Sequence, residues 1–173
     1  MEANTLNLPV LALRGLTVFP HTNLTFDVER RISIKALEVA MESGQEIFLV
    51  TQREINVEKP TEQDLYAIGT ISRVTQILRL GQNSLRVMVE GGRRARLKRL
   101  WQLEPYLQGQ VETAEEPESV NHGPKTEALL RQTWSLFQDY AQLAGNVAEE
   151  VIAAALDCQE PGYLADLIAQ NIA

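Results

Sequence analysis

The chain of 173 residues has one cysteine and two histidines, which leaves little material for a metal site or a disulfide. A single cysteine cannot form an internal disulfide, and a zinc site needs several Cys and His ligands. Cys158, His21 and His122 fall on three different expected elements, so no metal site is predicted. Cys158 is interpreted as a free buried thiol, which is typical of a reducing compartment, and we expect the cytoplasm.

The sequence also lacks a long apolar run, a signal segment and an excess of positive charge. No run approaches the roughly 18 to 20 residues that span a bilayer. The first residues, 1–4, form neither a basic n-region nor an apolar h-region. The net charge is −7 and the pI is near 4.9, which disfavours general binding to nucleic acid because phosphate neutralisation needs local Lys and Arg. We therefore expect no membrane partner and no general nucleic-acid partner.

Catalytic motifs are lacking as well. The string closest to a phosphate-binding loop, residues 123–126 (GPKT), has a proline between glycine and lysine, and no expected strand leads into it. No Gly-x-Ser-x-Gly elbow or His-Glu-x-x-His motif occurs. The acidic residues at 115, 116 and 118 lie in an expected linker, where exposure to solvent is enough to explain them. The chain is therefore predicted to be a non-enzymatic binding or assembly module without a cofactor of its own.

What the chain does contain is a globular composition, 45% hydrophobic and 23% charged, that divides near residue 115. The first part is mostly strand-like, with one amphipathic helix over about residues 29–42 that ends at Gly44. Pro9 indicates an edge strand or a strand start, and Gly91-Gly92 is expected to break a strand. About seven short strands are expected, over residues 6–13, 24–28, 47–50, 67–80, 84–90, 93–103 and 105–113. Because hairpins link most of them, the sheet should be mixed or antiparallel and curl into a small barrel.

The second part is helical. Residues 115–124 form an acidic, proline-containing linker, and helical periodicity begins at Lys125. Three helices are expected, the first stopped by Gly145-Asn146 and the third begun by Pro161. The first helix carries a wide apolar face made of two neighbouring stripes: Leu130, Trp134, Phe137 and Ala141, and Leu129, Leu136, Tyr140 and Leu143. Because no C-cap follows the last periodic residues, we expect the polypeptide to continue.

Two surfaces are candidates for function. The hairpin around residues 81–83 carries more apolar side chains than one face can bury: Ile77, Leu78, Leu80, Leu85 and Met88. They either pack against the helices or form an exposed patch that grips unfolded polypeptide.

The second candidate is a basic run, residues 93–99, in which Arg94, Arg96 and Lys98 share one face of a strand. It is either an anion or RNA patch or a solvated face that deters edge pairing. No cluster of exposed aromatics accompanies it, although single-strand binding usually needs such stacking platforms.

Five stretches resemble, in order, the N-terminal region of Lon proteases. They are residues 8–20 (LPVLALR and, after a gap, VFP), 33–41 (SIKALEVAM), 64–70 (DLYAIGT), 87–96 (VMVEGGRRAR) and 160–166 (EPGYLAD). The resemblance covers residues 6–172. It departs from the family pattern at Gly15, where an acidic residue is common, and at His21, where glycine is common.

The resemblance implies an α+β fold: a small β-rich, PUA-like pseudo-barrel with one inserted helix over residues 1–114, then the linker and a helical bundle over 125–173. It implies capture of unfolded, damaged or degron-bearing proteins and assembly within a homohexamer. The family's ATP- and Mg-dependent motor and its Ser-Lys protease dyad would lie outside this chain. On this basis the hairpin residues are the expected contacts for polypeptide, with Phe19, Pro20 and His21 as a second lip. RNA binding through Arg94, Arg96 and Lys98 remains the alternative.

Overall fold

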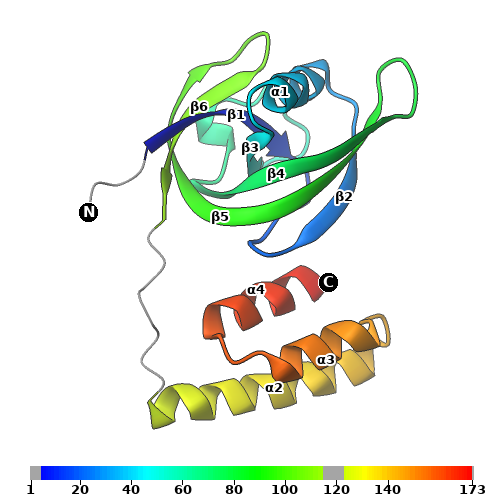
Figure 1. Ribbon diagram of the computed structural model, residues 1–173, viewed down its shortest axis with the longest axis vertical. Coiled ribbons are helices and arrows are strands. Elements are labelled where there is room, and N and C mark those ends of the chain that lie inside the picture. Colours follow the sequence, from blue (N-terminus) through cyan, green and yellow to red (C-terminus); the bar gives the residue numbers. More distant parts are fainter. Residues whose placement is uncertain (1–4, 115–122, 173) are drawn as a thin grey trace. The chain divides into compact units, whose positions relative to one another are not determined.

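The computed structural model describes residues 5–114 and 123–172 (Figure 1). The chain divides into two compact units, residues 1–115 (unit 1) and 116–173 (unit 2). The expected linker falls largely on residues 115–122, which lie outside the described part of the chain.

Unit 1 is built on one mixed sheet. Its described strands are β1 (Thr5–Leu13), β2 (Asn23–Val28), β3 (Glu46–Thr51), β4 (Ile68–Arg79), β5 (Leu85–Gln102) and β6 (Leu107–Thr113). They follow the order β2-β5-β4-β3-β1-β6, and β5 also pairs with β6, which closes five strands into a small barrel (Figure 1). β1 and β3 are parallel, whereas the other pairs are antiparallel. The expected mixed, curled sheet is confirmed.

The glycine pair Gly91-Gly92 does not break a strand, contrary to the sequence prediction. β5 continues through it as one strand of 18 residues, so the two expected strands are one and the described strands number six. Ser72 pairs with Gly91 and Ile71 with Arg93, which leaves Gly92 as the extra residue of a bulge. The bulge bends β5, whose first half pairs with β2 and whose second half pairs with β6.

β1 and β3 are buried on both faces, which explains their continuous apolar sequences. Leu11 and Leu13 of β1 enter one core cluster, whereas Val10 and Ala12 enter the other. Pro9 does not mark an edge, because β1 lies between β3 and β6. The pairing of β1 with β3 begins at Val10, one residue after the proline. Pro9, which has no backbone N–H, therefore interrupts no hydrogen bond to β3.

One helix, α1 (Arg31–Glu42), is inserted between β2 and β3, as expected. Its inward face consists of Ser33, Ala36, Leu37 and Ala40, all buried, and the apolar members of that face belong to the core cluster of Leu11 and Leu13. The helix ends at Glu42 with Ser43 as its C-cap, and Gly44 follows with φ 104°, a left-handed conformation that glycine adopts without strain.

Unit 2 contains three helices among its described residues, α2 (Pro124–Ala144), α3 (Glu149–Asp157) and α4 (Pro161–Asn171). Gly145 ends α2 with φ 65°, and Pro161 occupies the first turn of α4, both as expected. The buried side chains at the centre of the unit are Leu130, Phe137, Ala155, Cys158 and Leu164. Cys158 is a free, buried thiol. None of the helices in the described residues has the length and apolar character needed to cross a membrane.

A bidentate ion pair links β2 to β5 and predicts an acid-dependent loss of stability. Arg86 donates to both carboxylate oxygens of Asp27, at 2.8 and 2.9 Å. This hydrogen bonding lowers the pKa of Asp27 below its ordinary value. A carboxyl with a lowered folded-state pKa contributes stability above its unfolded pKa, and that contribution disappears as the pH falls through the folded value.

We therefore expect Asp27→Asn to reduce the dependence of Tm on pH below about pH 5, where the unfolded carboxyl begins to titrate. Thermal melts from pH 7 to pH 2 would measure this. Arg86→Gln should flatten the same part of the curve, and an unchanged curve in both variants would contradict the assignment.

Candidate functional site

The β4–β5 hairpin separates its five apolar candidates onto two faces. The hairpin turn is closed by the Leu80 amide, which donates to the carbonyl oxygen of Ser84 at 3.0 Å. Along β5, side chains alternate, so that Leu85, Val87 and Val89 are buried while Arg86 and Met88 are exposed. Of the five candidates, Leu78, Leu80 and Met88 are therefore exposed, whereas Leu85 is buried and Ile77 is half-buried.

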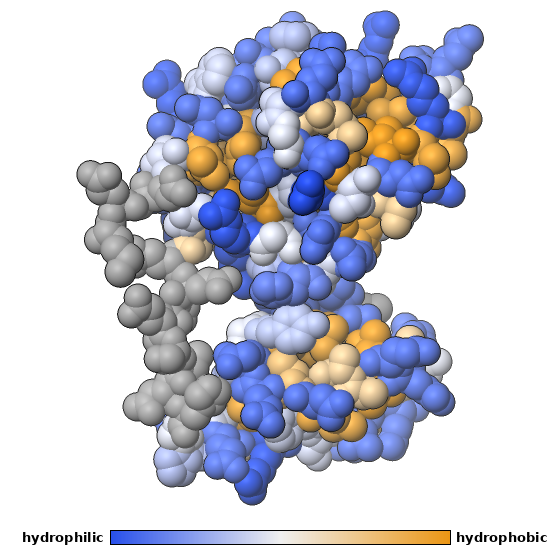
Figure 2. All heavy atoms as spheres, in the orientation of Figure 1, coloured by the Kyte–Doolittle hydropathy of each residue, from blue (hydrophilic) through white to orange (hydrophobic). Residues whose placement is uncertain are grey.

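The outer face of the hairpin carries Leu78, Leu80 and Met88, which are 47%, 50% and 40% exposed. Leu78 pairs with Arg86 and Gln76 with Met88, so Leu78 and Met88 are diagonal neighbours across the two strands. We call Leu78, Leu80 and Met88 the outer hairpin surface. Figure 2 shows apolar atoms gathered on the side of unit 1 where this hairpin projects.

The inner face of the hairpin carries Ile77 and Leu85. Leu85 is only 4% exposed and belongs to the core with α1, so it is not an exposed contact as the sequence suggested. Ile77 is half-buried against the same core. Both residues border a shallow hollow of about 500 Å³ that Glu38 and Met41 of α1 also line.

The loop of Phe19, Pro20 and His21 lies at the opposite end of the β2–β5 ladder from the hairpin turn. The His21 amide donates to the carbonyl of Gly91 at 2.8 Å, and the Gly91 amide donates to Thr22 at 2.8 Å. Gly91 lies six residues after Leu85 along the strand, which corresponds to about 20 Å. Pro20 is fully buried, and only His21 is exposed. The structure therefore does not bring this loop to the outer hairpin surface.

The basic candidates Arg94, Arg96 and Lys98 do share one face of β5, as the alternation predicted. Lys98 forms an ion pair with Glu112 at 3.0 Å, and the neighbouring Arg93 approaches Glu46 at 3.9 Å. These acidic partners reduce the net positive charge that phosphate binding would use. Within residues 5–114 and 123–172, no group of three or more His, Cys, Asp or Glu is placed to hold a metal ion.

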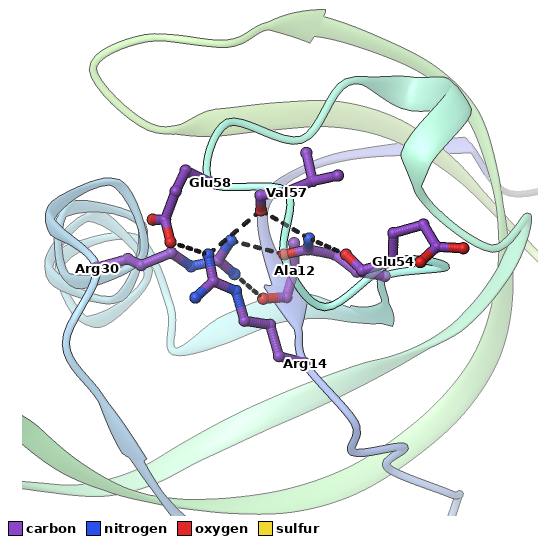
Figure 3. Close-up of polar contacts among 7 residues, drawn as sticks. Ala12, Arg14, Arg30, Glu54, Val57 and Glu58 are labelled. Atoms are coloured by element: carbon purple, nitrogen blue, oxygen red, sulfur yellow. Dashed lines mark hydrogen bonds and ion pairs between the residues drawn. The ribbon is translucent and has the colours of Figure 1, made fainter.

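A further polar cluster joins the end of β1, the start of α1 and the loop after β3 (Figure 3). The guanidinium of Arg30 donates to the Gln52 side-chain oxygen at 2.6 Å and to the carbonyl of Ala12. Gln52 is buried, and its amide donates to the carbonyls of Glu54 and Val57. Arg14 donates to Val57 at 3.2 Å and pairs with Glu58 at 3.0 Å. Figure 3 shows the guanidinium groups of Arg14 and Arg30 side by side, with Glu58 reaching toward Arg14.

Sequence reasoning did not identify this cluster. Its side chains are separated by up to 44 positions, between Arg14 and Glu58, and no local spacing connects them. One signal was present: a polar Gln52 comes directly after the buried end of β3, where a side chain needs a hydrogen-bonding partner.

Solved structures share the fold. The chain resembles the N-terminal domain of a Mycobacterium avium complex Lon protease with a TM-score of 0.71 at 22% identity, covering 92% of this chain and 80% of that one. It resembles a Lon N-terminal domain protein from Xanthomonas campestris with a TM-score of 0.56 at 16% identity, covering 95% of this chain and 97% of that one. At these identities the similarity establishes the architecture alone.

Sequence relatives are more informative. The chain is 39% identical to a Lon protease of Desulforamulus reducens over all of its length, and 39% identical to one of Brevibacillus choshinensis over 95% of it. It is 35% identical to Lon protease 1 of Bacillus subtilis over 96% of its length. The chain spans about a fifth of the length of these curated relatives, 21% in each case. Residues 7–173 match the model of the ATP-dependent protease La (LON) substrate-binding domain, and the chain therefore belongs to this family of non-catalytic Lon protease regions.

Proposed function

We propose that unit 1 captures unfolded or degron-bearing polypeptide through the outer hairpin surface, on behalf of a cytoplasmic ATP-dependent protease. In that protein the ATP- and Mg-dependent motor and the Ser-Lys protease dyad belong to the region beyond this chain. The observation that supports the surface is the exposure of Leu78, Leu80 and Met88 together near the end of one hairpin.

Exposed apolar groups gathered in one place gain free energy when a partner removes them from water, at about 25 cal/mol per Å². Leucine and methionine side chains lack β-branching, and methionine adapts its shape to different partners. Such a surface suits ligands that share apolar content rather than one sequence. A projecting hairpin also reaches an extended chain without rearrangement of the barrel, whose core residues Leu85 and Val87 remain buried.

The test replaces Leu78, Leu80 and Met88 with serine together and measures affinity for a permanently unfolded, reduced and carboxymethylated protein. We expect a loss of about tenfold or more, since half-burying three apolar side chains contributes on the order of 1.4 kcal/mol or more. The matched control replaces Ile55, Ile68 and Leu103, which are exposed to a similar degree elsewhere in unit 1. Equal losses in both triple variants, with both folded, would contradict the site.

A second proposed role is assembly with other copies, supported by a line of exposed leucines on α2. Leu129, Leu136 and Leu143 repeat every seven residues and are 54%, 61% and 90% exposed. A seven-residue repeat of leucines is typical of a helix that packs against another helix. They belong to the second stripe of the expected wide apolar face. Its fourth member, Tyr140, packs against the core of unit 2 together with Leu130, Trp134 and Phe137 of the first stripe.

Sedimentation velocity of the chain should therefore show weak, concentration-dependent association. The triple change of Leu129, Leu136 and Leu143 to serine should shift the sedimentation coefficient at high concentration toward that of the monomer. Leu156→Ser, at an exposed position on α3, serves as the control. Association that is unaffected by the triple change would exclude this face.

A further inference from the structure

An open cleft of about 590 Å³ includes Arg14, Arg30 and Glu58 of the cluster in Figure 3 and is lined in part by the end of β2. Its lining includes both arginines of that cluster, Arg14 and Arg30, and two half-buried apolar side chains, Leu16 and Phe26. None of its lining residues belongs to β4 or β5. The cleft therefore combines two guanidinium groups with an apolar lining, and it also contains three acidic residues, Asp27, Glu29 and Glu58.

The charge of Arg30 is not balanced by a carboxylate. The described hydrogen bonds of its side chain go to neutral oxygens, those of Gln52 and Ala12. Among the described residues, no acidic group lies within ion-pair distance of it. Burial lowers the pKa of Arg30 and the neighbouring Arg14 lowers it further, while Glu58 acts in the opposite direction. A half-buried guanidinium beside a second one favours the arrival of a negative group.

The acidic residues around the cleft do not remove this preference. Asp27 is held by Arg86 in the bidentate pair described above, and Glu29 is exposed. Glu58 pairs with Arg14, but its side chain is 74% exposed. An exposed ion pair contributes only about 0.2 to 1 kcal/mol, so a ligand can displace it. The pair of Glu58 with Arg14 also shows that Arg14 can hold a carboxylate here, in the position that a ligand carboxylate would take.

The first turn of α1 adds to the positive potential. It contains no acidic residue, and its N-cap, Arg30, makes no side-chain capping hydrogen bond. The first amide groups of a helix carry a partial positive charge, which acidic side chains commonly offset. Here two consecutive basic residues, Arg30 and Arg31, stand at that end of the helix instead.

We propose that this cleft binds a carboxylate carried by an apolar group, such as the carboxyl terminus of a polypeptide that ends in an apolar residue or a small free carboxylic acid. Arg14 exchanges the Glu58 carboxylate for that of the ligand, and Arg30 supplies a second, fixed positive charge. Leu16 and Phe26 contact the apolar part of the ligand. A planar guanidinium can hold a carboxylate through two parallel hydrogen bonds. The apolar lining then favours an acid with an apolar group over inorganic phosphate, which has none.

The test is an NMR titration of the ¹⁵N-labelled chain with defined probes. N-acetylleucine and a five-residue peptide ending in leucine should shift the amide signals of Arg14, Leu16 and Phe26, whereas their C-terminal amides and inorganic phosphate should bind at least tenfold more weakly. Tighter binding of the peptide than of N-acetylleucine identifies a polypeptide terminus as the source, and equal binding identifies a small acid. Equal binding of acids and amides, or of phosphate, would overturn the proposal.

Two variants separate this role from a structural one. Arg14→Met should weaken binding of N-acetylleucine about tenfold or more, because it removes a charge-assisted hydrogen bond. Glu58→Gln should strengthen binding about two- to fivefold, because it removes the internal competitor. Arg131→Met and Glu127→Gln alter a comparable exposed pair on α2 and should change nothing. Unchanged or weaker binding in Glu58→Gln, with dispersed spectra showing an intact fold, would contradict the exchange.

Discussion

Gly91→Ala is expected to destabilise unit 1 by about 3 kcal/mol, although alanine adds a single methyl group. A Cβ at Gly91 would lie 2.1 Å from the backbone oxygen of Phe19 and 3.3 Å from that of Thr22. These are main-chain atoms, so a change of rotamer cannot relieve the contact. Either the loop separates from β5 and loses its two hydrogen bonds to Gly91, or β5 shifts at its bulge. Overpacking and lost backbone hydrogen bonds each cost on the order of 1 to 3 kcal/mol.

Urea unfolding followed by tryptophan fluorescence would measure this effect. Unit 1 contains Trp101 and unit 2 contains Trp134, so a Trp134→Phe background lets the signal report on unit 1 alone. The control is Gly81→Ala, because a Cβ at Gly81 would meet nothing within 4 Å. A midpoint for Gly91→Ala as high as that of Gly81→Ala would show that the loop is not held against β5 in this way.

Arg30→Met is expected to cost about 2 to 4 kcal/mol, far more than Arg14→Met. Methionine retains an apolar stem but donates no hydrogen bond to Gln52 or to the carbonyl of Ala12. Gln52 is almost completely buried. Its side-chain oxygen would therefore lose the hydrogen bond from Arg30, and water could not replace it. Hydrogen bonds from a charged donor contribute about 1.5 to 3 kcal/mol, and an unsatisfied buried acceptor costs its desolvation.

Arg14→Met is the comparison for Arg30→Met, because both changes replace an arginine of the same cluster with methionine. Its partner Glu58 is exposed, and such pairs contribute little to stability, so Arg14→Met should cost less than about 1 kcal/mol. The free energies of unfolding of both variants, measured in urea as above, would decide this. Similar costs for the two substitutions would show that Arg30 is not the structural member of the pair.

Local pattern was sufficient for most of the fold. The helical period placed α1, α2, α3 and α4 within a few residues, and Gly44, Gly145 and Pro161 have the terminal positions that their chemistry favours. What local pattern could not distinguish was a strand break from a bulge at Gly91-Gly92. The difference depends on the carbonyl of Phe19, more than 70 positions earlier, whose close approach requires a glycine.

For the candidate site, local pattern predicts which side chains are buried but not which segments are brought together. Strand alternation places Leu85 with Val87 and Val89, so its burial could have been predicted from the sequence. The separation of the Phe19 loop from the hairpin turn depends on how β2 pairs along β5, which no short-range pattern encodes. The cleft of Arg14 and Arg30 likewise requires β1, α1 and the loop after β3 to be assembled first.

The central claim is that unfolded polypeptide contacts the outer hairpin surface, and site-specific photocrosslinking tests it most directly. A photoreactive phenylalanine analogue would be incorporated at Leu80 in one preparation and at Ile55, exposed elsewhere in unit 1, in another. The account predicts efficient crosslinking of a reduced, carboxymethylated protein from position 80 and little from position 55. Equal crosslinking from both positions, or more from position 55, would contradict it.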